Sequence, residues 1–263
     1  MRSVLICHAG AELNRYSLPG WLSSFSDLAA VVVIDETRKQ KRRRVKYQLK
    51  RDGFLKLIDV MLLKAYYAAS PLRKIDREKE ARLIQSIQAT YPYPDNVQEF
   101  HTSNPNNRAT RRYVSDQNPD LAIVRCKLLL KPALFDLPTF GSYVIHPGIC
   151  PQYRNSHGCF WALLNRDLEN VGCTLLRIDK GIDTGPIYGF YRCEFDELSD
   201  THIDIQTRSV VDNLEPIKNK LLAITQNEAT PIDVSDRPSA VWGQPGLTDF
   251  LRWKRLAKLH SRR

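Results

Sequence analysis

Two short stretches near the start of the chain contain runs of four or more consecutive apolar residues. Residues 2–7 read Arg-Ser-Val-Leu-Ile-Cys and residues 29–34 read Ala-Ala-Val-Val-Val-Ile. Strands with one face in water alternate apolar and polar residues, so continuous runs predict strands buried on both faces, as in a parallel sheet between helices. Similar stretches predict further strands at residues 97–101, 121–124, 141–146, 172–178 and 189–195.

Segments of helical composition or periodicity separate these strands. They lie at residues 11–26, 108–117, 163–166, 203–225 and 247–259. This alternation predicts an α/β fold with a doubly wound, mostly parallel sheet flanked by helices and joined by right-handed crossovers. We expect residues 1–190 to form this domain. Residues 191–263 are too few for a second domain of ordinary size, so we expect them to add a strand and helices to the same domain.

Residues 37–90 interrupt the alternation. A basic run, Arg38–Lys46, is followed by apolar residues at helical spacing, and Pro71 separates this first helix from a second one at about residues 76–89. The segment predicts an inserted helical pair with a strongly basic leading edge. Two interpretations of the basic run stay open: a solvated helix face, or a patch that binds an anionic acceptor or polyanion by pairing Arg and Lys with phosphates.

Charge and cysteine usage limit the partners and the compartment. The formal net charge is +10, which favours anionic partners such as nucleotide-sugars, polyglutamylated cofactors or nucleic acid; nucleic acid is left open. The six cysteines form no Cys-x-x-Cys pair, no secretory leader is visible, and no apolar run is long enough to cross a bilayer. We therefore expect a cytoplasmic protein with reduced thiols, no metal site and no membrane span.

The segment at residues 141–189 carries the side chains best suited to chemistry. One predicted strand ends in His-Pro-Gly at residues 146–148, and a later strand is followed by Gly-Ile-Asp-Thr-Gly-Pro at residues 181–186. Ligands of open parallel sheets bind outside the carboxyl ends of the strands, so we expect His146 and Asp183 to face one crevice. Such a pair suits acyl transfer to an amine, because one group stabilises charge on the carbonyl oxygen while another helps to remove the amine proton.

This combination resembles the folate-dependent formyltransferase family, which includes glycinamide ribonucleotide transformylase, methionyl-tRNA formyltransferase and sugar-amine formyltransferases. The family run Asn-x-His-Pro-Ser-x-x-Pro-x-Tyr-Arg is matched by His146-Pro147, Pro151 and Tyr153-Arg154, and the run Gly-x-Asp-x-Gly-Pro is matched at residues 181–186. The similarity is clear over residues 118–190 and looser over the first two strands. It implies transfer of a formyl group from 10-formyltetrahydrofolate, as co-substrate, to the amine of a small acceptor.

The resemblance also implies roles for single residues. His146 would steady the developing oxyanion and shuttle a proton, and Asp183 would orient His146 and accept the amine proton directly or through water. The loop at residues 125–131 would contact the pterin, largely through backbone groups, and Arg154 and His8 are candidates for binding the acceptor. The expected cofactor-binding residues are Arg125, Cys126, Lys127, Leu128, Leu129, Val144 and Gly181.

Two positions depart from the family pattern. The family asparagine two residues before the histidine is Val144, which can neither donate nor accept a hydrogen bond, and the family serine is Gly148. Loss of one oxyanion donor typically lowers turnover by about 10²–10³-fold. Asn155 and His157 are candidates for the missing donor, and His157 matches a histidine of this loop in some family members that act on glycinamide ribonucleotide.

Other functions stay open beside an N-formyltransferase that acts on a small, possibly anionic amine acceptor. The same site could activate water and hydrolyse 10-formyltetrahydrofolate. The chain could instead be a catalytically impaired formyltransferase-like protein whose basic insertion binds RNA or another polyanion. We see no sizeable C-terminal extension of the kind that methionyl-tRNA formyltransferases carry for tRNA. The Gly-x-Gly-x-x-Gly spacing of a dinucleotide site is also missing, so nicotinamide or flavin binding is not expected.

Overall fold

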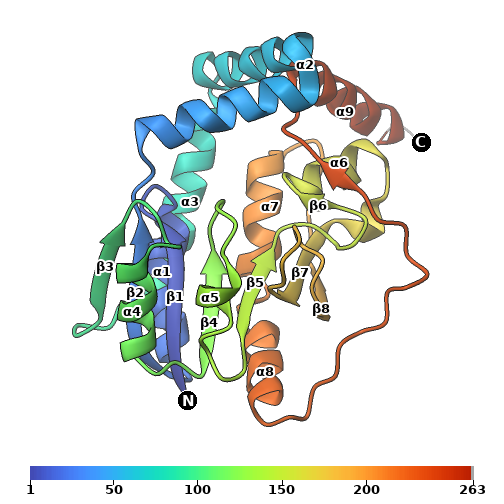
Figure 1. Ribbon diagram of the computed structural model, residues 1–263. Coiled ribbons are helices and arrows are strands. Elements are labelled where there is room, and N and C mark those ends of the chain that lie inside the picture. The colour runs from blue at the N-terminus through green and yellow to red at the C-terminus, as the bar shows by residue number, and fades with distance from the viewer. Residues whose placement is uncertain (262–263) are drawn as a thin grey trace.

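The computed structural model describes residues 1–261 and is built on a seven-stranded sheet (Figure 1). The strand order is β3-β2-β1-β4-β5-β7-β8. The first five of these strands are parallel, and β7 runs antiparallel to both of its neighbours. The mostly parallel sheet predicted from the sequence is therefore confirmed. Its strands are β1 (Arg2–His8), β2 (Asp27–Ile34), β3 (Gln98–Thr102), β4 (Leu121–Arg125), β5 (Ser142–His146), β7 (Gly172–Arg177) and β8 (Ile187–Arg192).

Helices cover both faces of the sheet, and alternate residues of each strand face the two layers. Leu5 and Cys7 of β1 pack in a cluster with one layer of helices, whereas Val4 and Ile6 pack in a cluster with the other layer. This two-sided burial explains the continuous apolar runs. The first layer consists of α1 (Glu12–Ser23), α3 (Leu72–Thr90), α7 (His202–Val211) and α8 (Leu214–Thr225), and the second of α4 (Arg108–Asp116) and α5 (Pro132–Phe135).

The inserted helical pair is present as α2 (Arg38–Ala69) and α3. Thr37 begins α2 with a capping box, in which its hydroxyl accepts from the backbone N–H of Gln40 and the Gln40 side chain accepts in return. Gly53 breaks α2 with a φ of +83°, a conformation that favours glycine. The two halves of α2 cross above the carboxyl ends of the parallel strands (Figure 1).

A separate apolar cluster joins the second half of α2 to the end of the chain. Leu63 of α2 packs there with residues of α6 (Gly158–Leu164), α7 and α9 (Leu247–His260). The expected division into residues 1–190 and 191–263 stays a prediction. No helix within residues 1–261 is both long and apolar enough to cross a bilayer.

Several predicted boundaries are wrong. The single helix expected at 203–225 is two helices, α7 and α8. In a continuing helix the backbone N–H of Asn213 would donate to the carbonyl of Ser209, but the Asn213 side-chain amide donates to that carbonyl instead. The strand expected at 189–195 is β8, and the helix expected at 163–166 is the end of α6, after which Arg166 adopts a φ of +60°. Residues 168–170 form a short 3₁₀ helix. A two-residue strand, β9 (Val241–Trp242), was not expected and pairs with β6 (Arg154–Asn155).

Candidate active site

The structure brings His146 and Asp183 together. His146 is the last residue of β5 and is 5% exposed, and its Nδ1 lies 3.5 Å from Oδ2 of Asp183. The path by which the chain brings Asp183 to His146 differs from the expected one, in which both residues follow strands that end at the same edge of the sheet. Because β7 is antiparallel to β5, with Tyr143 opposite Arg177, the end of β7 lies at the opposite edge of the sheet from His146. The loop between β7 and β8 (residues 178–186) must therefore turn back along the sheet to carry Asp183 to the imidazole.

The Gly-x-Asp-x-Gly-Pro sequence explains how this loop turns back. Asp179 accepts hydrogen bonds from the backbone N–H of Gly181 at 2.9 Å and from the hydroxyl of Thr184 at 2.8 Å, which closes the loop. A Cβ on Gly185 would lie 1.9 Å from the carbonyl oxygen of Arg177, so no side chain fits at this position. At the tip, Asp183 has a φ of +51°, which aspartate tolerates better than most residues.

Asn155 holds the carboxylate of Asp183 in place through its backbone. Its N–H donates to Oδ2 of Asp183 at 2.8 Å. The φ of Asn155 is +79°, in the left-handed region that asparagine adopts more readily than most residues. The side-chain amide donates instead to the carbonyl of Trp242 at 2.6 Å. The amide predicted to replace the missing oxyanion donor is thus engaged away from the His146–Asp183 pair.

Residues 240–244, which we call the C-terminal strap, bind the loop that follows His146. The indole N–H of Trp242 donates to the carbonyl of Gln152 at 2.8 Å, and its ring stacks on Tyr153 and Trp161 with centroid separations of 5.9 and 4.8 Å. Nε2 of His157 donates to Oε1 of Gln244 at 3.1 Å. The sequence did not predict this contact, since a pairing of two-residue strands between distant segments leaves no local pattern.

His157 is a second imidazole in this loop. Burial, as the largest cause, and the nearby cations Lys127 and Lys64 together lower its pKa to about 4, although the hydrogen bond to Gln244 acts in the opposite direction. Its Nδ1 is buried and has no hydrogen-bond partner within residues 1–261. The ring lies 5.9 Å from that of His202, which is also buried. His157 is therefore a neutral group at ordinary pH.

A family model described as formyl transferase matches residues 54–216, which is more than half of the 263-residue chain. The chain belongs to the formyl transferase family. The resemblance found in the sequence is thereby confirmed.

One relative of this family member is the methionyl-tRNA formyltransferase of Methylacidiphilum infernorum, 30% identical over 139 residues, or 49% of this chain and 43% of that protein. The matching parts span 24% to 43% of the methionyl-tRNA formyltransferases of this organism and of Dehalococcoides mccartyi. The phosphoribosylglycinamide formyltransferase of Anaplasma phagocytophilum has the same fold, with a TM-score of 0.55 at 14% identity over 94% of this chain and 97% of that one. A sugar 3N-formyltransferase solved with dTDP and 5-N-formyl-tetrahydrofolate has a TM-score of 0.51 at 15% identity over 92% and 69%.

The two departures from the formyl transferase pattern have different surroundings. Val144 lies on the same side of β5 as His146 and packs against an apolar cluster of Cys150, Leu176 and Ile187. Gly148 lies where a Cβ would come within 2.7 Å of the carbonyl oxygen of Tyr153 and 2.9 Å of Nε2 of His146. In this member of the family, a serine at 148 would collide with the hydrogen bond that His146 makes.

That hydrogen bond defines the tautomer of His146. Nε2 lies 2.9 Å from the carbonyl oxygen of Tyr153, and because a carbonyl only accepts, Nε2 carries the hydrogen. In the neutral ring, Nδ1 therefore presents its lone pair toward Asp183. The N–H expected to steady the oxyanion is engaged with Tyr153, so the geometry favours the proton-transfer role of His146 over the oxyanion role.

The loop after β4 lies beside His146 and Asp183, and two of its backbone groups are held by hydrogen bonds. The carbonyl of Leu129 accepts from the side-chain amide of Asn106 at 2.9 Å, and the backbone N–H of Lys127 donates to Nε2 of His8, also at 2.9 Å. The N–H groups of Leu128 and Leu129 have no partner among the described residues, and the Leu129 side chain is 63% exposed. An apolar surface beside free N–H donors suits the edge of a flat heteroaromatic ring.

Four further predicted residues are placed as follows. Arg125 donates from Nη1 to the carbonyl of Ile145 and from Nε to the Asn14 side chain at 3.1 Å, and burial lowers its pKa. Burial raises the pKa of the Cys126 thiol to about 11, which keeps it protonated. Arg154 donates to the carbonyl of Ile182 at 3.3 Å. Gly181 lies in the loop between β7 and β8, where a Cβ would meet the side chain of Thr184.

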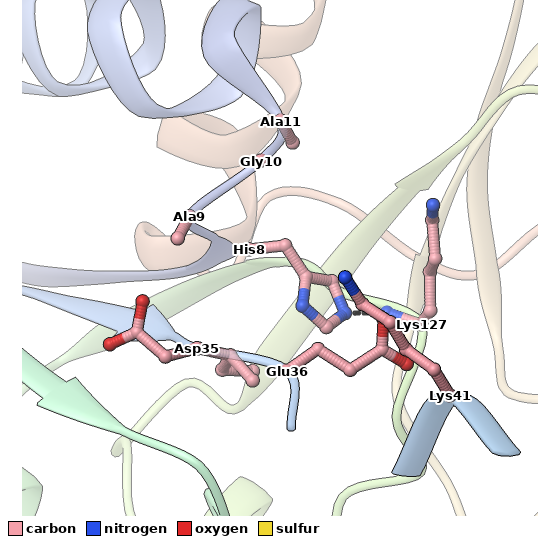
Figure 2. Close-up of a pocket in the computed structure, with 9 residues that line it drawn as sticks. His8, Ala9, Gly10, Ala11, Asp35, Glu36, Lys41 and Lys127 are labelled. Atoms are coloured by element: carbon pink, nitrogen blue, oxygen red, sulfur yellow. Dashed lines mark hydrogen bonds between the residues drawn. The ribbon is translucent and has the colours of Figure 1, made fainter. Parts of the chain in front are cut away.

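His8 lines a pocket of about 300 Å³ at the carboxyl end of β1 (Figure 2). β4 separates β1 from β5 in the sheet, and neighbouring strands lie about 4.8 Å apart, so this pocket is roughly 10 Å from the end of β5 and His146. Burial and Lys127 lower the pKa of His8. Within residues 1–261, no group of three or more His, Cys, Asp or Glu side chains is arranged to hold a metal ion.

Proposed function

We propose that this chain transfers a formyl group from 10-formyltetrahydrofolate to the amine of a small acceptor, with His146 and Asp183 as its acid–base pair. The observation that carries the proposal is the meeting of Nδ1 and Oδ2 at 3.5 Å, with a backbone N–H holding the carboxylate from the other side. Membership of the formyl transferase family supplies the reaction class.

The chemistry follows from the proton count of the pair. With a neutral ring and an ionised carboxylate, no hydrogen lies between Nδ1 and Oδ2, so the pair has room for one proton. When the amine nitrogen bonds to the formyl carbon, it acquires positive charge and must lose a proton. Asp183 or His146 accepts that proton, and the leaving folate nitrogen receives one in return as its bond to the formyl carbon breaks. General acid–base catalysis of this kind contributes about 10²–10⁴-fold.

The folate would lie against the loop after β4. Leu128 and Leu129 offer free N–H groups and an exposed apolar surface there, next to Cys126 and beside the end of β5. Val144 and Gly181 would line the side of the site nearest the formyl group. The solved sugar formyltransferase with 5-N-formyl-tetrahydrofolate shows that this fold accommodates a folate in another protein, and His8 and Arg154 would contact the acceptor.

The test is a turnover assay of the full chain with 10-formyltetrahydrofolate and a panel of small amines, following folate release and acceptor mass. Asp183→Asn keeps the size of the side chain and removes its basicity, so turnover should fall about 10²–10⁴-fold. Asp179→Asn is the matched control, because Asp179 lies in the same loop and its recorded hydrogen bonds stay within that loop. Its turnover should fall far less.

Three outcomes decide between the functions considered. Turnover that needs an amine and is lost in Asp183→Asn supports the transferase. Folate release without any amine indicates a hydrolase, and no release under any condition, with intact circular dichroism, indicates a binding protein. Full turnover in Asp183→Asn would show that this pair is not the catalytic site.

A further inference from the structure

Helix α2 carries almost all of the net charge of the protein. It has eleven Lys and Arg against two Asp, a net charge of +9 out of the chain's +10. The helix lies at the end of the molecule beyond the carboxyl ends of the parallel strands (Figure 1), and Gly53 divides it into two halves. The two halves present different chemistry on the sides that face away from the rest of the protein.

The first half of α2 has a basic outer face. Its inner side is marked by Gln48, which is buried, and by Lys41, which lines the pocket beside His8. Because successive helix residues are about 100° apart, five exposed basic residues fall together on the opposite side, within an arc of about 100°. They are Lys39, Arg42, Arg43, Lys46 and Lys50. None of the five makes an ion pair within residues 1–261, so their charges are free for a partner.

The second half of α2 has an apolar outer face. Val60 and Leu63 are buried and mark its inner side. On the opposite side, an arc of about 160° contains no charged residue. The members of this arc are all exposed: Phe54, Leu55, Ile58, Met61, Leu62, Ala65, Tyr66, Ala68 and Ala69. Leu55 is 81% exposed and Phe54 is 66% exposed. A contiguous exposed apolar face of this kind marks an interaction site.

The two faces together favour one kind of partner. A second copy of the chain would cover the apolar face, but it would bring two helices of charge +9 close to each other. A nucleic acid would pair with the basic face, but it has no apolar region in which aliphatic side chains leave water. The surface of an anionic bilayer offers both, because its headgroups attract cations and its acyl chains accept apolar side chains.

We propose that the outer face of α2 binds the surface of a membrane that contains anionic lipids. The basic half would contact the headgroups, and the apolar half would enter the boundary between headgroups and acyl chains, as basic amphipathic helices do. The proposal does not depend on the proposed function. Because α2 crosses above the carboxyl ends of the parallel strands (Figure 1), the membrane would lie on the same side of the sheet as His146, the last residue of β5.

Co-sedimentation of the full chain with vesicles of equimolar phosphatidylcholine and phosphatidylserine tests the proposal. We expect binding that falls as salt is added and is far weaker on pure phosphatidylcholine. Arg42→Gln/Lys46→Gln should weaken binding about 25-fold, since each basic residue near an anionic surface contributes about five-fold. The matched control, Arg177→Gln/Lys220→Gln, removes the same charge at the end of β7 and on α8, far from α2 (Figure 1). It should change binding by less than about two-fold, because salt screens distant charges.

Leu55→Gln separates insertion from charge attraction. Because Leu55 is largely exposed, its replacement leaves the fold intact, and loss of one inserted leucine should weaken binding about ten-fold or more. Ile232→Gln is the matched control. Ile232 is also exposed, and its N–H donates to the carbonyl of Ile187 at the start of β8, at the end of the sheet opposite α2. Its replacement should leave binding unchanged.

Absence of vesicle binding, or equal effects of each variant and its matched control, would overturn the proposal. Weakening by Arg42→Gln/Lys46→Gln without weakening by Leu55→Gln would reject insertion of the apolar half. A dimer that Leu55→Gln dissociates, in a chain that does not bind vesicles, would assign the apolar face to a second copy. Salt-sensitive RNA binding in place of vesicle binding would assign the basic face to nucleic acid. The assay contains no folate and no amine, so its result is independent of turnover in Asp183→Asn.

Discussion

His157 should make the protein sensitive to mild acid. The imidazole has an ordinary pKa of 6.5 in the unfolded chain and a pKa of about 4 in the folded one. The unfolded state therefore binds the proton more readily, and the free energy of unfolding falls as pH drops from 6.5 toward 4. Each pKa unit corresponds to 1.36 kcal/mol, so the whole loss attributable to His157 is about 3 kcal/mol. Above pH 6.5 this penalty is absent.

The variant that isolates the effect is His157→Asn. Asparagine accepts the φ of +53° at this position and has no proton to gain. Urea unfolding of both proteins at half-unit steps from pH 8 to pH 4 measures the free energy of unfolding. Loss of the Gln244 hydrogen bond should lower it by about 1 kcal/mol at every pH, so the informative quantity is the slope. Between pH 6.5 and 4 the slope should be smaller by up to about 1.36 kcal/mol per pH unit in the variant.

Some acid sensitivity should persist in His157→Asn, because burial also lowers the pKa of His202 well below its ordinary value. His260→Asn is a control for loss of a histidine as such, at an exposed position near the end of α9. Parallel curves for the parent chain and His157→Asn across this pH range would refute the reasoning, since they would mean that His157 gains its proton equally in the folded and unfolded states.

Two further predictions concern the surroundings of the His146–Asp183 pair. Val144→Asn restores a polar side chain on the same face of β5 as His146. If a missing oxyanion donor limits the rate, turnover should rise by as much as about 10²-fold, while the free energy of unfolding falls by about 1–3 kcal/mol because the amide enters an apolar cluster. Unchanged or lower turnover in a folded variant would show that a missing oxyanion donor does not limit the rate. Trp242→Ala removes two stacking contacts and a hydrogen bond, so it should lower the free energy of unfolding by about 2–4 kcal/mol and reduce turnover. Trp242→Phe should recover most of the stability and most of the turnover. Equal defects in the two variants would show that the stacking is unimportant.

The sheet and the proximity of His146 to Asp183 were predictable because each is marked by a local sequence pattern. The sheet appears as continuous apolar runs, and the two site residues appear as motifs of fixed spacing. Asp183 lies next to His146 as expected, but its loop does not begin at the end of the sheet where His146 lies. Because β7 is antiparallel to β5, the loop begins at the opposite end and turns back. Strand direction depends on pairing between distant segments, which apolar periodicity does not encode.

Other features of the site had no sequence signal of that kind. Asn155 was expected to act through its side chain and instead contacts Asp183 through its backbone N–H, a group that every non-proline residue has. The break between α7 and α8 lies within an unbroken helical periodicity and depends on one side-chain amide at Asn213. Lys41 could not be separated from its basic neighbours until the direction of α2 above the sheet was known.

The C-terminal strap has a consequence for the order of folding. Asn155 bonds to a carbonyl that lies 87 residues later in the chain, and Trp161 bonds to the carbonyl of Gly243, 82 residues later. During synthesis, when the N-terminal part of a chain emerges first, the parallel strands can assemble long before these partners leave the ribosome. The loop that follows His146 would then lack its hydrogen-bond partners until residues 240–244 have emerged, although the parallel strands before it are already complete.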